Sequence, residues 1–267
     1  MTLSVVIITY NEELNIERTL KSVAPLMHDP GGEIIVVDSG STDRTLEIAR
    51  SLGAKVFVEP WKGFAAQKNS AIEKASGDWI LSLDADEEVS QGTREAIARV
   101  LGLDQDDHSK ISGYWISRKN YFLGRWIRHG GFSPDRKLRL FRRRKGQFED
   151  RRVHETVNVQ GKTHVLEWDF VDGDISLIHK AYPTLSSYID HMNHYSSLAA
   201  EMAVEKAPHG FSLLNIVFRP AATFFYNYFL RLGFLDGREG LLLHLYHATY
   251  VSWKYAKAWE LSRSRPG

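Results

Sequence analysis

The sequence predicts an α/β fold, with a doubly wound, mostly parallel sheet followed by a helical C-terminal region. Strand-like and helix-like segments alternate through about the first 90 residues, which is typical of such sheets. Near residue 182 the strand signals stop and helical ones begin. The 267 residues, 43% of them hydrophobic, can bury a full α/β core and a smaller appended unit. We therefore expect one domain over residues 1–180 and a helical region over 181–267.

Each element of the first domain has its own signal. Residues 3–9 form an unbroken β-branched run, as in a strand covered on both faces. A helix is expected over about 12–23, since apolar residues recur at helical spacing and Pro25 follows. The second strand, 33–38, ends in a turn whose Asp43 or Thr42 can cap the next helix, through Arg50. The remaining elements are a strand at 55–58, a helix at 64–75 and a strand at 79–83.

Polar side chains follow three of these strands at their carboxyl ends. They are Thr9 to Glu12, Asp38 to Gly40, and Asp84 to Asp86. Ligands of open α/β sheets bind outside the carboxyl ends of the strands, so the three clusters predict one pocket. Asp38 has an alternative role, because an Asp before Ser-Gly often accepts hydrogen bonds from turn amides.

Asp84 and Asp86 are the strongest candidates for a metal site. They end an apolar strand and are spaced one residue apart, so both carboxylates can turn toward one point. Hard oxygen ligands suit Mg²⁺ or Mn²⁺, which phosphate oxygens and water commonly complete. No glycine-rich dinucleotide fingerprint follows the first strand, and no Gly-Lys-Ser/Thr phosphate loop occurs. A cation held against a diphosphate is therefore favoured over hydride transfer.

Four motifs together resemble the family 2 inverting glycosyltransferases, nucleotide-sugar enzymes with a GT-A fold. They are Val5–Glu12, Ile35–Asp43, Gln67–Asn69 and Gly77–Glu87, in the same order and spacing. Two shorter motifs, Val153–Glu155 and Gly233–Gly240, are most similar to bacterial lipopolysaccharide core β-1,4-glucosyltransferases.

The resemblance implies roles for the residues of the first 90 positions. Thr9 and Tyr10 would pack around the nucleobase, in a nucleotide site that also includes Asn11 and Glu12. Asp38 would accept from the imide N–H, which favours uracil. Asp84 would lie near the ribose and the metal, and Asp86 would bind the metal directly. Lys68 would lie near the nucleotide, although a solvated helix lysine is an equally good interpretation.

An inverting transfer needs a general base that takes the proton of the acceptor hydroxyl. The family often uses a late acidic residue, and the chain offers Glu155 and Asp150 within the predicted base and acceptor region, about 110–180. The similarity to core transferases favours Glu155, with Asp150 as the alternative. His154 would orient the acceptor or diphosphate, or serve as a hydrogen-bonded structural histidine.

Residues 136–145 carry seven Lys and Arg side chains. A nucleic-acid site is disfavoured, because the chain's net charge is only +1 and the segment alternates with apolar residues as a strand does. We expect a strand and turn facing an anionic acceptor or membrane surface, with Arg139 as a candidate acceptor or phosphate contact.

The C-terminal third is aromatic-rich and helical. Residues 188–204 and 238–261 read as helices, and 211–231 is densely apolar yet interrupted by Asn215, Arg219 and Pro220. These interruptions argue against a transmembrane helix. Helices lying in the membrane interface fit better, and an ordinary helical subdomain or dimer interface is the alternative. In the last helix, His244 and Lys257 are expected on a polar stripe, with Leu245 away from it.

We therefore expect a metal-dependent transferase moving a hexose, glucose from UDP-glucose, onto a lipid-linked saccharide such as the lipopolysaccharide inner core. A polyprenyl-phosphate sugar synthase and a non-catalytic nucleotide-sugar-binding scaffold are the alternatives. The expected location is the cytoplasmic face of the inner membrane, peripheral or monotopic. The first strand begins at once, leaving no room for a signal peptide, and the absence of cysteine excludes disulfides and thiolate zinc sites.

Overall fold

The computed structural model describes residues 1–27, 31–102, 111–149, 156–167, 173–206 and 210–264. The chain forms two compact units. The first contains residues 1–118 and 135–179, and the second contains 119–134 and 180–267. The helical region predicted from residue 181 thus shares its unit with an earlier stretch, residues 119–134.

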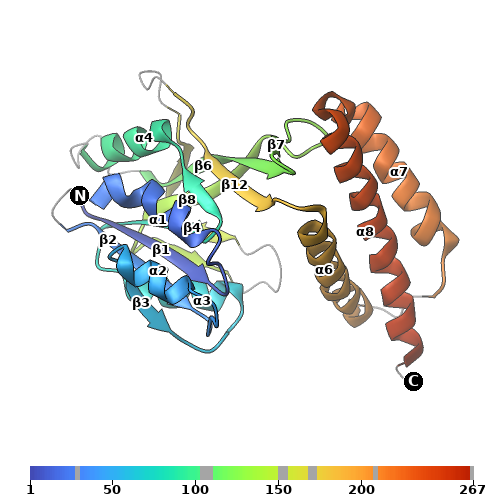
Figure 1. The fold of residues 1–267 in the computed structure, drawn as a ribbon, viewed down its shortest axis with the longest axis horizontal. Coiled ribbons are helices and arrows are strands. Elements are labelled where there is room, and N and C mark those ends of the chain that lie inside the picture. Colours follow the sequence, from blue (N-terminus) through green and yellow to red (C-terminus); the bar gives the residue numbers. More distant parts are fainter. Residues whose placement is uncertain (28–30, 103–110, 150–155, 168–172, 207–209, 265–267) are drawn as a thin grey trace. The chain divides into compact units, whose positions relative to one another are not determined.

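The first unit begins with four parallel strands in the order β3-β2-β1-β4 (Figure 1). Residues Ile8 and Asp84 are paired, and so are Thr9 and Asp38, so the carboxyl ends of β1, β2 and β4 lie at one edge. The strands are β1 (Leu3–Thr9), β2 (Glu33–Asp38), β3 (Lys55–Val58) and β4 (Trp79–Asp84). The helices between and after them are α1 (Ile16–Val23), the short η1 (Ala24–Met27), α2 (Thr45–Ser51), α3 (Phe64–Glu73) and α4 (Gln91–Gly102).

Alternate residues of β1 enter two separate cores. Val5 and Ile7 pack in one cluster with Leu20 of α1, whereas Val6 belongs to a second cluster with Ala71 of α3. Side chains of a strand point alternately to the two faces of the sheet, so both faces are covered. This explains why the strand is apolar at nearly every position rather than at every other one.

The second half of the sheet is antiparallel. Strand β8 (Asp135–Arg142) pairs antiparallel with both β4 and β6 (Ile111–Phe122), and β12 (Leu177–Tyr182) pairs antiparallel with β5 (Glu87–Val89). The smaller strands are β7 (Arg125–Trp126), β11 (Lys162–Val165) and the separate pair β9 (Gly146–Phe148) and β10 (Val157–Val159). The α/β class is confirmed, and the sheet is mixed: most parallel pairing lies in the N-terminal half, and β11 also pairs parallel with β6.

The second unit is helical. Helix α8 (Gly237–Ser264) packs against α6 (Leu185–Lys206) and α7 (Arg219–Phe225) (Figure 1). Wider turns flank α7, namely η2 (Leu214–Phe218) and η3 (Tyr226–Leu230), and η4 (Gly233–Asp236) precedes α8. Among the residues described, no helix is both long and apolar enough to cross a membrane.

One expectation for α8 is wrong. His244, assigned to an exposed polar stripe, is buried, whereas Leu245 is 49% exposed. Lys257 also points inward, donating hydrogen bonds to Asn193 and Ser196 of α6. Helical spacing identifies a stripe, but it does not reveal which side of the helix meets its neighbours.

Candidate active site

A buried ion-pair network surrounds Asp84 at the end of β4. The ammonium of Lys68 lies 2.8 Å from Oδ1 of Asp84, and the guanidinium of Arg139 lies 2.5 Å from Oδ2. Arg139 also contacts Glu87 at 2.7 Å, and Arg118 bridges Glu87 to Asp135. Lys68, Arg139 and Glu87 are buried, while the Asp84 carboxylate keeps 31% of its surface exposed at the edge of the sheet.

These cations hold Asp84 ionised. Burial by itself raises the pKa of Asp84, but the charges of Arg139 and Lys68 outweigh it, so the pKa lies well below the usual range. Although burial opposes them, the carboxylates of Asp84 and Glu87 raise the pKa of Arg139 above its already high value. The backbone N–H of Asp84 donates to Glu87 as well. The network therefore fixes both the charge and the orientation of the Asp84 carboxylate.

Asp86 is beside a histidine that the sequence did not suggest. Nε2 of His179 lies 3.1 Å from Oδ2 of Asp86. His179 comes from β12, where it pairs with Glu87 of β5. Burial raises the pKa of the nearby Glu12, and the carboxylates of Asp86 and Asp84 raise it further, against a hydrogen bond from Asn15. Negative charge is thus concentrated around Asp86.

The donor set at Asp86 fits a divalent cation that is completed by a substrate. Within the described ranges, no three His, Asp or Glu side chains come together to hold a metal on their own. A carboxylate oxygen and an imidazole nitrogen leave several coordination positions to other oxygens, and Mg²⁺ or Mn²⁺ commonly takes those from phosphates and water. Asp84 fits less well as a ligand, since both its oxygens already bind cationic side chains.

The β1 and β2 ends are tied together by their loops. Asp38 is fully buried and accepts from the backbone N–H groups of Gly40 and Ser41 at 2.8 and 2.7 Å, as the turn alternative anticipated. Asn11 receives a hydrogen bond from the N–H of Thr42. Tyr10 is 57% exposed next to them, so its ring is open to a stacking partner.

The base candidates Asp150 and Glu155 lie outside the described residues, and so does His154. The described residues on either side, Glu149 and Thr156, are joined by a backbone hydrogen bond of 3.0 Å. Asn69 of α3 is hydrogen-bonded to both backbone groups of Phe148. The ammonium of Lys68 lies 5.2 Å from the Phe148 ring centroid. Phe148, two residues before Asp150 in the sequence, therefore lies beside Lys68.

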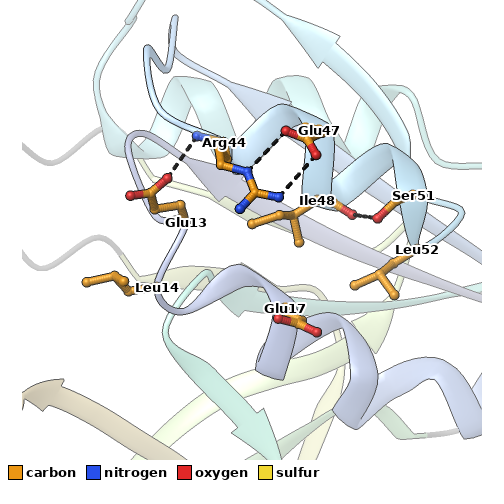
Figure 2. Close-up of a pocket in the computed structure, with 8 residues that line it drawn as sticks. All are labelled: Glu13, Leu14, Glu17, Arg44, Glu47, Ile48, Ser51 and Leu52. Carbon is orange, nitrogen blue, oxygen red and sulfur yellow. Dashed lines mark hydrogen bonds and ion pairs between the residues drawn. The ribbon is translucent and has the colours of Figure 1, made fainter.

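A hollow of about 460 Å³ lies elsewhere on the first unit, between α1 and α2 (Figure 2). Arg44 lies across this hollow. Its backbone N–H donates a hydrogen bond to Glu13, and its guanidinium donates hydrogen bonds to Glu47. Leu14 and Leu52 form apolar parts of its lining. None of the predicted site residues lines it. We place the site at the strand ends instead, where the perturbed carboxylates and buried cations converge.

Sequence reasoning missed several residues of this site. Glu87 was visible beside Asp84 and Asp86 but carried no role, and Arg118, Asp135 and His179 come from distant strands with no local motif. Arg139 was expected to contact an acceptor. The structure places its guanidinium in the carboxylate network instead, at 5% exposure. The interpretation of Lys68 as a solvated helix lysine is wrong, since this lysine is 3% exposed and ion-paired.

Comparison with known proteins connects this geometry to a family. The family model described as Glycosyl transferase family 2 matches residues 4–160. The chain is 32% identical to the lipopolysaccharide core biosynthesis glycosyltransferase LpsC of Rhizobium meliloti, over 89% of this chain and 82% of that protein. It is also 31% identical to the uncharacterized glycosyltransferase RT0209 of Rickettsia typhi, over 97% of this chain and 87% of the relative.

Two solved structures show limited similarity. The Mycobacterium tuberculosis glucosyl-3-phosphoglycerate synthase, solved with Mn²⁺, uridine diphosphate and glucosyl-3-phosphoglycerate, matches with TM-score 0.35 and 28% identity, over 45% of this chain and 44% of that one. TarS 1–349 of S. aureus matches with TM-score 0.47 and 18% identity, over 99% and 92%. The sequence matches over most of the chain establish the family: the chain belongs to glycosyltransferase family 2, and it is a glycosyltransferase with a GT-A-like α/β fold.

Proposed function

We propose that this glycosyltransferase moves a hexose, glucose from UDP-glucose, with inversion onto a membrane-anchored saccharide such as the lipopolysaccharide inner core. The name of the Rhizobium relative, which aligns over 89% of this chain, supports the acceptor class. The location that follows is the cytoplasmic face of the inner membrane, where the protein would be peripheral or monotopic.

In this proposal the diphosphate lies against Asp86 and His179. These two side chains would hold Mg²⁺ or Mn²⁺, with the remaining positions left to the donor and water. The bound cation offsets the negative charge that grows on the leaving diphosphate. Asp84 stays anionic beside it because Lys68 and Arg139 fix it, and it is placed to accept from a ribose hydroxyl.

The nucleobase would lie over the loops that follow β1 and β2. The hydroxyl of Thr9, at the end of β1 next to Tyr10, is buried and has no hydrogen-bond partner among the described residues. The exposed ring of Tyr10 offers a stacking surface next to it. Because the Asp38 carboxylate accepts from turn amides, we assign to it the shaping of the Ser39–Ser41 turn that borders the base.

Glu155 is our first choice for the general base, and Asp150 is the second. The base takes the proton of the acceptor hydroxyl as its oxygen attacks the anomeric carbon. Support comes from the anchoring of the neighbouring Phe148 by Asn69, next to Lys68. Glu155→Gln and Asp150→Asn separate the two, because only replacement of the base should lower kcat by about 10²- to 10⁴-fold without weakening donor binding.

The observation that carries the proposal is the meeting of Asp84, Asp86 and His179 at the strand ends. Calorimetric titration of UDP and UDP-glucose, with and without Mn²⁺, tests it on the wild type and on Asp86→Asn. We expect metal-dependent binding by the wild type and at least about tenfold weaker binding by the variant, since a coordinating oxygen is lost. Glu88→Gln is the matched control, being a partly exposed carboxylate two residues away. Metal-independent binding, or equal loss in both variants, would refute the donor-site assignment.

A further inference from the structure

The outward surface of residues 211–235 is apolar. Within the helical run from η2 through α7 to η3, Leu214, Phe218, Phe225 and Phe229 are 67%, 62%, 55% and 46% exposed. Their spacing of four or seven residues places them on one side of a helix. With their exposed neighbours they form what we term the outer face: Phe211, Leu213, Leu214, Val217, Phe218, Phe225, Tyr226, Phe229, Leu230, Leu232, Phe234, Leu235, Leu241 and Leu245.

Polar side chains of the same helices lie on the inner side. Asn215 and Asn227 are half-buried, although both interrupt an apolar run. In α8, His244 is 1% exposed while Leu245 is 49% exposed. A helix on the surface of a protein in water normally shows the opposite arrangement, with polar residues outward. Apart from Arg219 and Arg231, the exposed positions of residues 211–235 are thus apolar or aromatic, and an apolar area of this size marks an interaction surface.

The charge of this region selects the partner. From Ala207 to Leu235 the sequence contains no Asp or Glu, and its two charged residues are Arg219 and Arg231. The next acidic residue, Asp236, is buried and accepts from His129. Both arginines are exposed at the border of the outer face, and each guanidinium lies about 5 Å from a tyrosine ring, of Tyr255 and Tyr226 respectively. The apolar face is thus bordered by cations without acidic residues between them.

We propose that the outer face inserts into the interfacial layer of a bilayer containing anionic lipids, with Arg219 and Arg231 at the level of the lipid phosphates. Apolar and aromatic side chains at the headgroup boundary with cations above them are the arrangement that interfacial helices use. A second copy of the chain fits less well, because a two-fold contact between outer faces would bring arginines of both copies together without acidic partners. The inference deepens the proposed function by naming the surface that would meet the membrane holding the acceptor.

The first test measures binding of the full chain to vesicles in a sedimentation assay. The wild type should bind vesicles in which about one third of the lipid is phosphatidylglycerol. It should bind pure phosphatidylcholine vesicles at least about tenfold more weakly, since the two arginines then lack anionic partners. Phe218→Ser/Phe229→Ser should lower the partition coefficient about 100-fold, at about tenfold for each buried ring lost. Leu14→Ser/Val58→Ser is the matched control, because these side chains are as exposed but belong to the first unit.

A second test reports where the face goes. The chain contains no cysteine, so Phe225→Cys and Leu14→Cys each give one labelling position for an environment-sensitive fluorophore. Vesicles should shift the emission at position 225 to the blue and make it sensitive to a quencher placed in the lipid, and leave position 14 unchanged. Equal responses at both positions would overturn the proposal, as would a label at 225 that responds only to rising protein concentration, which indicates a second copy.

The test separates this inference from the proposed donor site. Calorimetric binding of UDP with Mn²⁺ should be the same in Phe218→Ser/Phe229→Ser and in the wild type, because the substitutions lie in the second unit. Loss of vesicle binding with donor binding retained supports the inference. Vesicle binding that survives the double substitution overturns it, whatever the donor experiment gives.

Discussion

The ammonium of Lys68 lies 2.8 Å from Oδ1 of Asp84, and at 3% exposure it is nearly inaccessible to water. A lysine in the middle of a helix in this alternating fold would ordinarily be solvated. Here α3 covers the face of the sheet that ends at Asp84, and Lys68 points into it. Because Asp84 also binds Arg139, which in turn binds Glu87, each positive charge of this network already faces a carboxylate.

The Lys68–Asp84 pair should show strong energetic coupling. A double-mutant cycle with Lys68→Met and Asp84→Asn, followed by urea unfolding, is expected to give about 1–3 kcal/mol, as for contacting residues in one ion-pair network. The pKa of Asp84 lies well below its usual range, so the carboxylate is still ionised at pH 4. The coupling should therefore be the same at pH 4 and pH 7. A cycle over the exposed pair Arg44 and Glu47 is the control, and its coupling should be much weaker because water screens the two charges. A coupling that disappears by pH 4 contradicts the assignment.

Glu33 should make the first unit sensitive to acid. Its side chain is 7% exposed, and although burial opposes ionisation, hydrogen bonds from Lys55, Ser76 and Ser4 lower its pKa to about 2. A carboxyl group whose pKa is lower in the folded than in the unfolded state stabilises the folded protein at any pH above its unfolded-state pKa. For Glu33 this contribution is lost as the pH falls from 4.5 to 2. At about 1.4 kcal/mol per pKa unit, it amounts to about 3 kcal/mol at pH 7.

Glu33→Gln measures this contribution. The wild type should be more stable than the variant in urea at pH 7, and the difference should shrink steadily from pH 4.5 to pH 2. Glu47→Gln, on an exposed helix surface, should change the stability little at any pH, because water screens the charge of Glu47. If the difference in stability between the wild type and Glu33→Gln stays constant with pH, the lowered pKa of Glu33 is not its source.

The strand ends were predictable because they depend on local patterns. The β-branched run of 3–9 requires two covered faces, and Asp38 and Asp84 follow buried strands directly, so adjacency of the parallel strands brings them together. The antiparallel half was not predictable in this way. Strand β8 carries Arg139, and its position beside β4 depends on pairing between residues that are far apart in sequence. Propensity contains no information about such partners.

The same reasoning explains why His179 was missed and His244 misplaced. His179 meets Asp86 only because β12 pairs with β5, so no spacing in the sequence signals it. For His244, the helical period correctly identified the side of the helix on which it lies. The period does not show whether the polar or the apolar side of the helix is buried. Which one it is depends on what the helix packs against, and here the rings of Phe132 and Tyr228 pack against His244.

Gly130 should tolerate alanine far less well than Gly124. Both have positive φ, of 68° and 83°, so both substitutions place an L-residue in an unfavourable conformation that costs about 1 kcal/mol. The two glycines differ in how much space surrounds an added Cβ atom. A Cβ at Gly130 would lie 2.0 Å from the His244 ring, whereas nothing lies within 4 Å of one at Gly124. Gly130→Ala should thus cost about 1–3 kcal/mol more than Gly124→Ala in urea unfolding. Adding His244→Ala should recover part of that excess, and equal costs for the two glycines would contradict the packing.

His244 should make the second unit lose stability in mild acid. Burial and, to a smaller extent, the neighbouring His247 lower the pKa of His244 to about 4, against the opposing charge of Asp236. In the unfolded chain a histidine takes up a proton near pH 6.5, so below that pH the unfolded state binds a proton that the folded state refuses. Stability is therefore complete above pH 6.5 and falls as the pH drops toward 4, by about 3 kcal/mol for a shift of this size.

His244→Phe should remove most of this dependence. The ring nitrogens of His244 have no hydrogen-bond partner among the described residues, so phenylalanine keeps the packing against Phe132 and Tyr228 without leaving a polar partner unpaired. Hydrogen exchange of α8 peptides at pH 7 and pH 4.5 localises the effect to the second unit. The exposed His194→Phe is the control and should retain the wild-type pH dependence. If α8 in His244→Phe opens as readily at pH 4.5 as in the wild type, the buried histidine is not what makes the unit acid-sensitive.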